Sequence, residues 1–222
     1  MKKQDSQIEL YGGLIKEGVV IINMEKVIRQ LVSHQLWLES RGEKGEQLNV
    51  DEVDFRDIDL TEYQFNDAYV TACTFDGMSL SGKKLASSLL GSSTFKYSNL
   101  ENADFHKVNA DYADFTSANI KNARFTKTDC CNTVFTKADL TNAKLIACSL
   151  YLTDFRDATL HNVDVSCSLF EDTLLKGAQL RDITGLEDAS IISINIGTPD
   201  DAIFLEEEEA REWLIMNNLK NQ

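Results

Sequence analysis

The sequence is short of proline, histidine and basic residues. It has one proline and three histidines among 222 residues, and its 36 acidic residues outnumber its 22 lysines and arginines, for a net charge of −14. A single proline excludes collagen-like and polyproline segments. The acidic excess disfavours nucleic acid and anionic membranes as direct partners. With 43% hydrophobic residues the chain is too apolar for intrinsic disorder and is expected to fold.

Long apolar runs and paired cysteines are also missing. In the first fifty residues the longest apolar run, Val19 to Ile22, is too short for a membrane span or for the apolar part of a signal peptide. The five cysteines form no CxxC pair and no cluster with histidine, which indicates reduced thiols rather than disulfides or a zinc site. We therefore expect a cytoplasmic protein that does not associate with a membrane.

An apolar residue recurs at every fifth position from Phe55 to Leu180, and a second series of mostly small residues lies two places before each member. This period matches neither a helix nor a flat strand, so the backbone must turn once per pentapeptide. Like residues recur at a spacing of twenty, which predicts four sides per coil and side chains stacked between coils. The predicted core ladder is Phe55, Phe75, Phe95, Phe115, Phe135, Phe155 and Leu175. Asparagines recur at the same spacing on an outward corner of the predicted coil. They form either a ladder of amide hydrogen bonds or a chance recurrence of polar residues: Asn102, Asn122, Asn142 and Asn162.

Segments such as Ala103-Asp104-Phe105, Ala113-Asp114-Phe115 and Ala138-Asp139-Leu140 resemble the consensus A-(D/N)-(L/F)-x-x of the pentapeptide-repeat family. The resemblance implies an all-β fold, a right-handed quadrilateral β-helix, with small α-helical caps at both ends. We expect the solenoid to span residues 48–182. One position departs from the pattern: Lys83 occupies a small inward place near Gly77 and Gly82, and we expect it to swing outward from a locally distorted coil.

The solenoid needs caps, because its ends expose core and unpaired strand edges. Residues 1–47 are expected to form an N-terminal cap, with a short strand at Val19 to Ile22. A helix should follow, capped by Asn23 and ending at about Ser40.

Residues 183–222 are expected to form a C-terminal cap after Gly185 ends the array. Ile192, Ile194 and Ile196 alternate with polar residues as a strand. Thr198-Pro199-Asp200-Asp201 predicts the start of a helix that runs to about Asn217. Its apolar stripe packs on the last coil or forms a homodimer, as some members of the family associate by their C-terminal ends. The residues concerned are Leu205, Trp213, Leu214 and Met216.

No catalytic, cofactor-binding or metal-ligating residues are predicted. His34, His106 and His161 have no nucleophile or metal-ligand partner at a recognisable spacing. Recurring aspartates are explained by the repeat consensus, and glycine-rich phosphate loops are absent. We therefore expect no enzyme activity and no cofactor.

A rigid rod is better suited to binding. One side of the predicted coil carries apolar residues at outward positions, and we take Tyr112, Tyr151, Leu152 and Leu169 as a candidate partner patch, with scattered surface apolar residues as the alternative. The leading hypothesis is a non-catalytic scaffold module of bacterial type that binds an unidentified protein. The alternative is a DNA-mimicking protector or inhibitor of a type II topoisomerase, DNA gyrase, because some family members act in this way. Against it, residues 53–182 carry 13 basic and 18 acidic residues, a net charge of only −5, and the register has no inserted loop.

Overall fold

The computed structural model describes residues 18–198 and 200–219. The chain forms two compact units, residues 1–49 and residues 50–222. The first contains helix α2 (Gly18–Glu39), and the second contains the solenoid and helix α3 (Glu207–Leu219). Neither of these helices is long and apolar enough to cross a membrane.

Helix α2 begins earlier than the sequence pattern predicts. The predicted strand at Val19 to Ile22 is wrong, because these residues are helical, and Asn23 lies inside the helix rather than capping it. β-branched residues favour strands only weakly, and a helix pairs its backbone groups within the segment, whereas a lone strand needs a partner. The helix ends at Glu39, close to the predicted end; residues 1–17 of the predicted cap lie outside the described residues.

The segment after α2 folds back along the helix. Gly45 has a φ of +74°, and a Cβ there would lie 2.2 Å from the Ser33 carbonyl oxygen, so glycine is required on both counts. Leu48 N donates to His34 Nδ1 over 3.1 Å, and Glu46 N donates to Ser33 Oγ over 2.9 Å. These bonds fix the exit from the helix.

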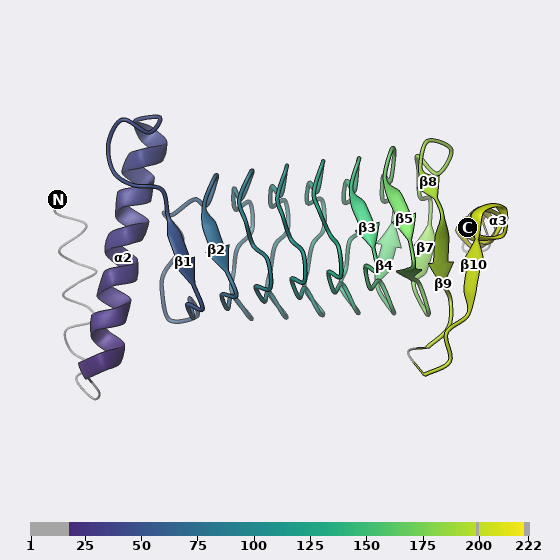
Figure 1. Ribbon diagram of the computed structural model, residues 1–222, viewed down its shortest axis with the longest axis horizontal. Helices are drawn as coiled ribbons and strands as arrows, with labels where there is room; N and C mark the ends of the chain where they lie inside the picture. The colour runs from purple at the N-terminus through teal and green to yellow at the C-terminus, as the bar shows by residue number, and fades with distance from the viewer. Residues whose placement is uncertain (1–17, 199, 220–222) are drawn as a thin grey trace. The chain divides into compact units, whose positions relative to one another are not determined.

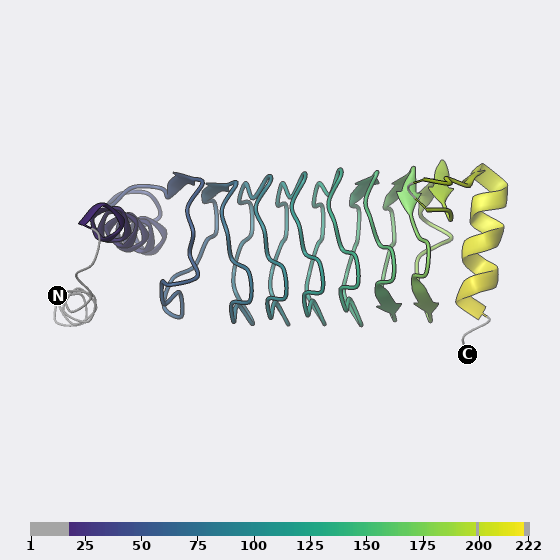
Figure 2. The same ribbon diagram turned by 90° about the horizontal axis from the view of Figure 1, so that it is seen from below.

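Residues 50–195 wind into a quadrilateral β-solenoid of about seven coils, so the predicted fold is confirmed (Figures 1 and 2). Residues twenty apart pair in parallel, as Leu150 does with Phe170 and Leu160 with Leu180. Isolated bridges with the same offset continue the pairing through the middle coils. The strands are β1 (Asn49–Asp51), β2 (Tyr69–Thr71), β3 (Ser149–Tyr151), β4 (Thr159–His161), β5 (Leu169–Glu171), β6 (Thr173–Leu174), β7 (Gln179–Arg181), β8 (Ser190–Ile191), β9 (Ser193–Asn195) and β10 (Phe204–Glu206). They form the sheets β1-β2, β3-β5-β8, β4-β7 and β10-β9-β6.

Phenylalanine rings stack along the inside of the solenoid. The rings from Phe55 to Phe155 that are twenty residues apart lie nearly parallel, with centroids 4.7 Å apart at the first pair and 5.1 Å apart at the last. A second column meets them edge to face, as Phe105 does with Phe115 at 5.6 Å. Offset stacks and edge-to-face contacts are the favourable arrangements of aromatic rings. The apolar column therefore stabilises each coil against its two neighbours.

The small inward residues also hold neighbouring coils together by hydrogen bonds. Thr128, Thr133 and Thr153 are buried, and each hydroxyl donates to a backbone carbonyl 23 residues earlier, over 2.6 to 2.8 Å. A short hydroxyl side chain is therefore favoured at these positions for two reasons. It fits the limited space inside the coil, and it finds a hydrogen-bond acceptor on the preceding coil, so that no buried polar group is left without a partner.

Lys83 follows the same rule, and the prediction that it swings outward is wrong. Its side chain is buried, at 6% exposure, and Nζ donates to the Leu60 carbonyl over 2.7 Å and to the Tyr63 carbonyl over 2.9 Å. Leu60 lies 23 residues earlier, so the long side chain makes inside the coil the bond that threonine makes elsewhere. Burial lowers the pKa of Lys83, while the nearby carboxylates of Asp59 and Glu62 oppose this shift.

The coils continue past Gly185. The chain turns there and takes one extra residue, so that Phe170 pairs with Ile191 rather than with residue 190, and β9 adds a further side by pairing with β6. Only Ile194 of the three predicted strand residues is buried, whereas Ile192 is exposed.

The C-terminal helix begins later than predicted. Thr198 Oγ1 accepts a bond from Asp201 N, but this bond closes the turn between β9 and the antiparallel β10 instead of starting a helix. Asn195 Oδ1 accepts bonds from Gly197 N and Ile203 N and holds this hairpin, so α3 starts only at Glu207.

Candidate functional site

The described residues offer no arrangement typical of an enzyme. They contain no group of three or more histidine, cysteine, aspartate or glutamate side chains that could hold a metal ion. His34 lies in α2, and His106 and His161 lie on different sides of the solenoid. Cys73 is buried, and burial raises its pKa to about 11, which makes its thiol a poor nucleophile.

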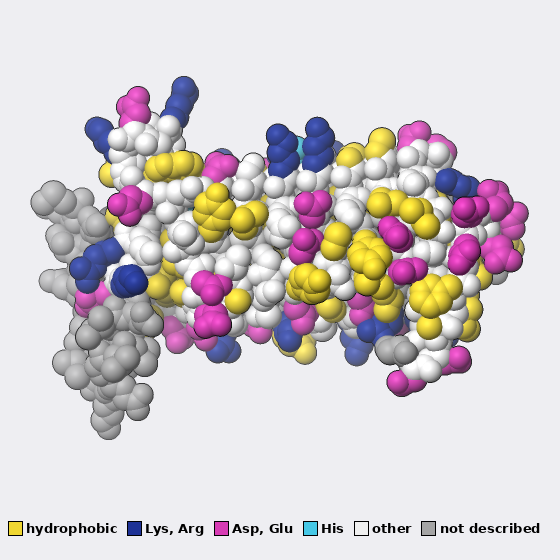
Figure 3. Space-filling view, in the orientation of Figure 1, with side chains coloured by type: hydrophobic (Ala, Val, Ile, Leu, Met, Phe, Trp, Pro, Cys, Tyr) yellow, Lys and Arg dark blue, Asp and Glu magenta, His cyan; other side chains and the backbone are white. Residues whose placement is uncertain are grey.

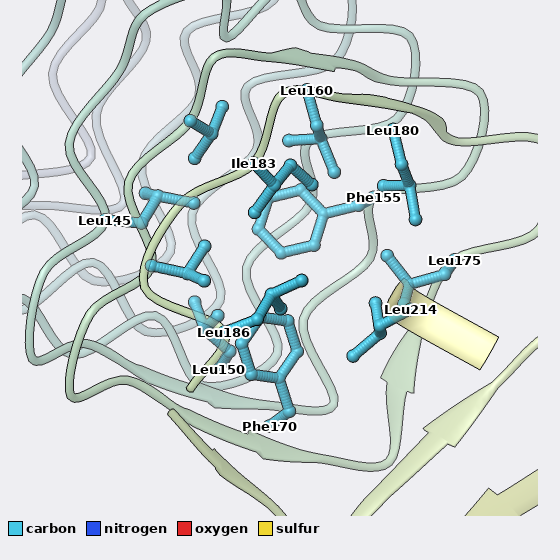
Figure 4. Close-up of a pocket in the computed structure, with 12 residues that line it drawn as sticks. Leu145, Leu150, Phe155, Leu160, Phe170, Leu175, Leu180, Ile183, Leu186 and Leu214 are labelled. Atoms are coloured by element: carbon cyan, nitrogen blue, oxygen red, sulfur yellow. The ribbon is translucent and has the colours of Figure 1, made fainter. Parts of the chain in front are cut away.

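An apolar cavity lies inside the C-terminal coils, where side chains of the solenoid meet α3 (Figure 4). Phe155, Phe170, Leu175 and Leu214 are among the residues that line it. Its volume is about 10 Å³, the lower limit for a single water molecule, and its lining offers no polar group that would hold an ordered water by a hydrogen bond. It is a packing defect between the last coils and the helix rather than a ligand site.

One side of the solenoid has the properties of a binding surface, and we call it the acidic face. It comprises residues 50–52, 69–72, 89–92, 109–112, 129–132, 149–152, 169–172 and 190–193, which include β1, β2, β3, β5 and β8. None of these residues is lysine or arginine. Figure 3 looks onto this face and shows apolar side chains and carboxylates in patches along the coils, with basic side chains at the margins of the coils.

The predicted partner patch lies on the acidic face. Tyr112 is 64% exposed, whereas Tyr151, Leu152 and Leu169 are half-buried. Tyr112 and Leu152 occupy the same corner two coils apart, a distance of about 10 Å. Further apolar residues that the sequence reading missed extend the patch along the face: Tyr69, Leu89 and Ile192, all exposed. The apolar surface therefore runs most of the length of the solenoid.

The acidic face also carries carboxylates that form no ion pair with another described residue. They are Asp51, Glu52, Asp111, Asp129, Glu171 and Asp172. On the other sides, lysine and arginine lie among the carboxylates and pair with several of them, as in Asp54–Arg56, Asp114–Lys96, Asp139–Lys121, Asp104–Arg124 and Asp154–Arg156. The acidic face therefore differs from the other sides in carrying carboxylates without any lysine or arginine among its residues.

Asp111 and Asp129 lie at the middle of this face. Asp111 is held in place, because its Oδ1 accepts a bond from Cys131 N over 3.0 Å and its Oδ2 accepts one from Asn109 Nδ2 over 2.9 Å. Partial burial, and to a smaller extent the charge of Asp111, raises the pKa of Asp129. Two neighbouring carboxylates with no cation between them repel each other, which disfavours the ionised form of Asp129.

Replacing Asp129 with asparagine should raise the free energy of unfolding at pH 7. Because the pKa is raised, the native state binds this proton more tightly than the unfolded chain does, so the carboxylate destabilises the fold above that pKa. The penalty disappears as the pH falls through the raised value, and the advantage of the variant should shrink between pH 7 and about pH 4. Urea denaturation at both pH values measures this. A variant less stable than the parent at pH 7, or a gain equalled by the matched change Asp157→Asn on another side, would contradict it.

The residues predicted to form the C-terminal stripe are divided between two environments. Leu214 and Ala210 of α3 are buried, and Arg211 donates to the Leu186 and Ala189 carbonyls over 2.6 and 3.0 Å, so the helix packs on the last coil. Leu205 lies in β10, Trp213 is half-buried and Met216 is 54% exposed. Of the four predicted residues, Leu214 alone is fully buried, so the stripe packs on the last coil only in part.

The asparagine corner is a structural feature on another side of the rod. Asn142 Nδ2 donates to Asn122 Oδ1, and Asn162 Nδ2 donates to Asn142 Oδ1, both over 3.1 Å. Asn122, Asn142 and Asn162 also have φ between +54° and +61°, a conformation that asparagine tolerates better than most residues. These side chains bond one another between coils.

Comparison with known proteins agrees with the coil geometry. The family model described as pentapeptide repeats matches residues 84–122 and 113–150 in eight copies. No curated protein matches the sequence. Solved structures that resemble the chain include a pentapeptide repeat protein of the Arabidopsis thaliana thylakoid lumen, with 18% identity over 69% of this chain and 88% of that one, and a TM-score of 0.37. A trypsin-treated variant of QnrB1, described as a plasmid-mediated fluoroquinolone resistance protein, has 17% identity over 63% and 84% of the two chains, and a TM-score of 0.35.

These TM-scores are too low to support an inference about function, so the assignment depends on the repeats themselves. Repeats matched by the family model occupy the middle coils, and the same twenty-residue pairing continues on both sides of them. Residues 84–150 are therefore pentapeptide repeats, and the solenoid around them has the fold of that family.

Proposed function

We propose that this protein is a non-catalytic interaction module whose acidic face binds another protein. The observation that carries the proposal is the combination, on one side of the rod, of exposed tyrosine and leucine side chains with carboxylates that have no ion-pair partner among the described residues. Tyrosine is enriched at protein interfaces, because its ring buries a large area at a small cost in side-chain entropy.

Rigidity of the surface supports the same function. Backbone bonds join each coil to the next, as Leu90 N to the Asn109 carbonyl over 2.8 Å and Cys130 N to the Ser149 carbonyl over 3.0 Å. A surface held in this way loses little conformational freedom on binding, which favours affinity. Loops and hinges are not needed to assemble it.

Site-specific photocrosslinking tests the proposal. A photoreactive phenylalanine analogue placed at Tyr112 should crosslink to a partner protein in the native cell, because that side chain is exposed on the acidic face. The matched control is the same analogue at Asn142, which is exposed on the asparagine corner. Equal yields at both positions, or no adduct at Tyr112, would reject the acidic face as the binding surface.

The topoisomerase alternative has less support. A duplex presents phosphates around its whole circumference, whereas here lysine and arginine lie among the carboxylates outside the acidic face and pair with several of them, as in Asp104–Arg124 and Asp154–Arg156. The uncompensated charge therefore does not reproduce the pattern of DNA. A gyrase supercoiling assay with the protein in excess decides this alternative.

A homodimer through the C-terminal end is a separate proposal. Ile203, Phe204, Ile215 and Met216 are exposed there, after Ala210 and Leu214 have packed inward. Light scattering over a range of concentrations decides whether a second copy covers them.

A further inference from the structure

We propose that the segment bound by the acidic face is a basic amphipathic helix of another protein, in which lysine or arginine residues are interleaved with apolar ones. This inference depends on the proposed function and names the chemistry of its partner. It is argued from charge complementarity, from the order of side chains along the face and from the width of the face.

Charge selects a basic partner. The acidic face has six carboxylates and no lysine or arginine among its residues: Asp51, Glu52, Asp111, Asp129, Glu171 and Asp172. Because none of them pairs with another described residue, a cation of the partner does not have to displace an internal one. Opposite charges across an interface also speed association and exclude acidic competitors.

Carboxylates gather in three bands along the rod, with apolar residues between them and with Tyr112 beside Asp111 in the central band. Asp51 and Glu52 lie at its start, and the apolar residues Tyr69 and Leu89 follow on the next two coils. The pair Asp111 and Asp129 comes next.

Beyond this central pair, Tyr151 and Leu152 form the second apolar band, and Glu171 and Asp172 form the last acidic one. At about 4.8 Å per coil, the centres of the acidic bands are about 17 Å and then about 12 Å apart. A partner must present cations at this spacing, with apolar side chains between them.

A helix fits this spacing and this width. With a rise of 1.5 Å per residue, residues i, i+11 and i+18 come within about 2 Å of the three bands, a difference that long arginine side chains span, and they lie on one stripe of a helix of about 20 residues. Each side of the solenoid presents three or four residues, about 10–13 Å of backbone, which is the diameter of one helix. A strand is not favoured, because backbone groups of the face already bond between coils, as Leu90 N does with the Asn109 carbonyl.

Defined peptides test this chemistry with the full-length protein. The probe is a fluorescent helical peptide of about 20 residues, with arginines on the i, i+11, i+18 stripe and leucines between them. Two companions replace the arginines with glutamates or the leucines with serines. Fluorescence anisotropy should show binding of the first peptide only, with an affinity that weakens as salt is raised.

Matched variants place the peptide on the face. The triple variant Asp111→Asn, Asp129→Asn and Glu171→Gln should weaken binding by about tenfold or more. The control Glu101→Gln, Asp157→Asn and Glu187→Gln changes the net charge equally at other positions and should change affinity by less than about twofold. Circular dichroism establishes that both triple variants remain folded; asparagine at position 111 keeps an acceptor for Cys131 N.

Several results would overturn the proposal. These are binding of the glutamate peptide as tightly as the arginine peptide, equal losses in the two triple variants, or no binding of the basic peptide. If the basic peptide fails while a photocrosslinker at Tyr112 still captures a partner, the helix chemistry is wrong and the interaction function stands. If light scattering shows a dimer that only the triple variant on the acidic face dissociates, the occupant is a second copy, and the proposal is likewise wrong.

Discussion

Replacing Phe115 with alanine should lower the free energy of unfolding by about 3–5 kcal/mol, the range for truncating a fully buried phenylalanine. Its ring is buried and stacks between Phe95 and Phe135, with centroid distances of 4.9 and 5.0 Å. Phe105 and Phe125 meet it edge to face at 5.6 and 6.0 Å. Four aromatic contacts are lost at once, and coils fixed by backbone bonds on both sides cannot close over the cavity.

Urea denaturation followed by far-ultraviolet circular dichroism measures this loss. The matched control is Tyr97→Ala, because that side chain is 70% exposed and lies one coil away; its effect should stay within about 0.5 kcal/mol. A solenoid unfolds through nearest-neighbour contacts, so the denaturant slope must be compared as well as the midpoint. A cost below about 1 kcal/mol for Phe115→Ala would mean that the stacked rings are not what holds the coils together.

The sequence predicts the coils well because the repeat is local. A side chain at every fifth position must point inward if the chain turns once per pentapeptide, and the recurrence at twenty residues counts the sides without any knowledge of long-range contacts. Phe55 and Phe75 therefore stack as their spacing indicates. The hydrogen bonds made by the small inward residues are harder to predict from the sequence. Thr128, for example, donates to a carbonyl 23 residues earlier, and this offset joins one side of a coil to a neighbouring side of the coil before it.

The ends are predicted poorly because tertiary pairing decides them. Thr198 has the features of a helix cap, yet β9 offers a strand edge that Phe204 to Glu206 can pair with, and the hairpin forms instead. Val19 to Ile22 has the composition of a strand but has no strand partner in the part of its unit that the structure describes. Local secondary-structure preference is a weak guide at the ends of the chain, because the outcome there depends on whether a strand edge is present to pair with.

The candidate site is only partly visible in the sequence. Tyr112, Tyr151, Leu152 and Leu169 can be placed on one side from their position in the repeat. The carboxylates around Asp129 are missed when charge is summed along the chain, because cations on the other sides conceal them. Summing charge by column of the coil reveals the signal, since no column of this face contains lysine or arginine.

Replacing Gly185 with alanine should be among the most destabilising single changes in the chain, at about 2–6 kcal/mol, the sum of left-handed strain and overpacking. Gly185 has a φ of +80°, and a Cβ there would lie 2.5 Å from the backbone nitrogen and 2.7 Å from the Cα of Ser166. Backbone on the preceding coil cannot move aside without breaking the bonds between coils.

Gly82→Ala is the matched control, because it separates dihedral strain from the steric clash. Gly82 also has a positive φ, of +66°, but a Cβ there meets nothing within 4 Å. It occupies the pentapeptide position at which Ala72 and Ala147, on other corners of the coil, adopt a φ of +49° and +55°. The control should therefore change the free energy of unfolding by no more than about 1 kcal/mol. Equal costs for the two variants in urea denaturation would show that the dihedral alone sets the penalty. A much larger loss of unfolding free energy for Gly185→Ala than for Gly82→Ala would show that the close contact with Ser166 requires glycine. Gly185 is also the point after which the twenty-residue register gains one residue before β8.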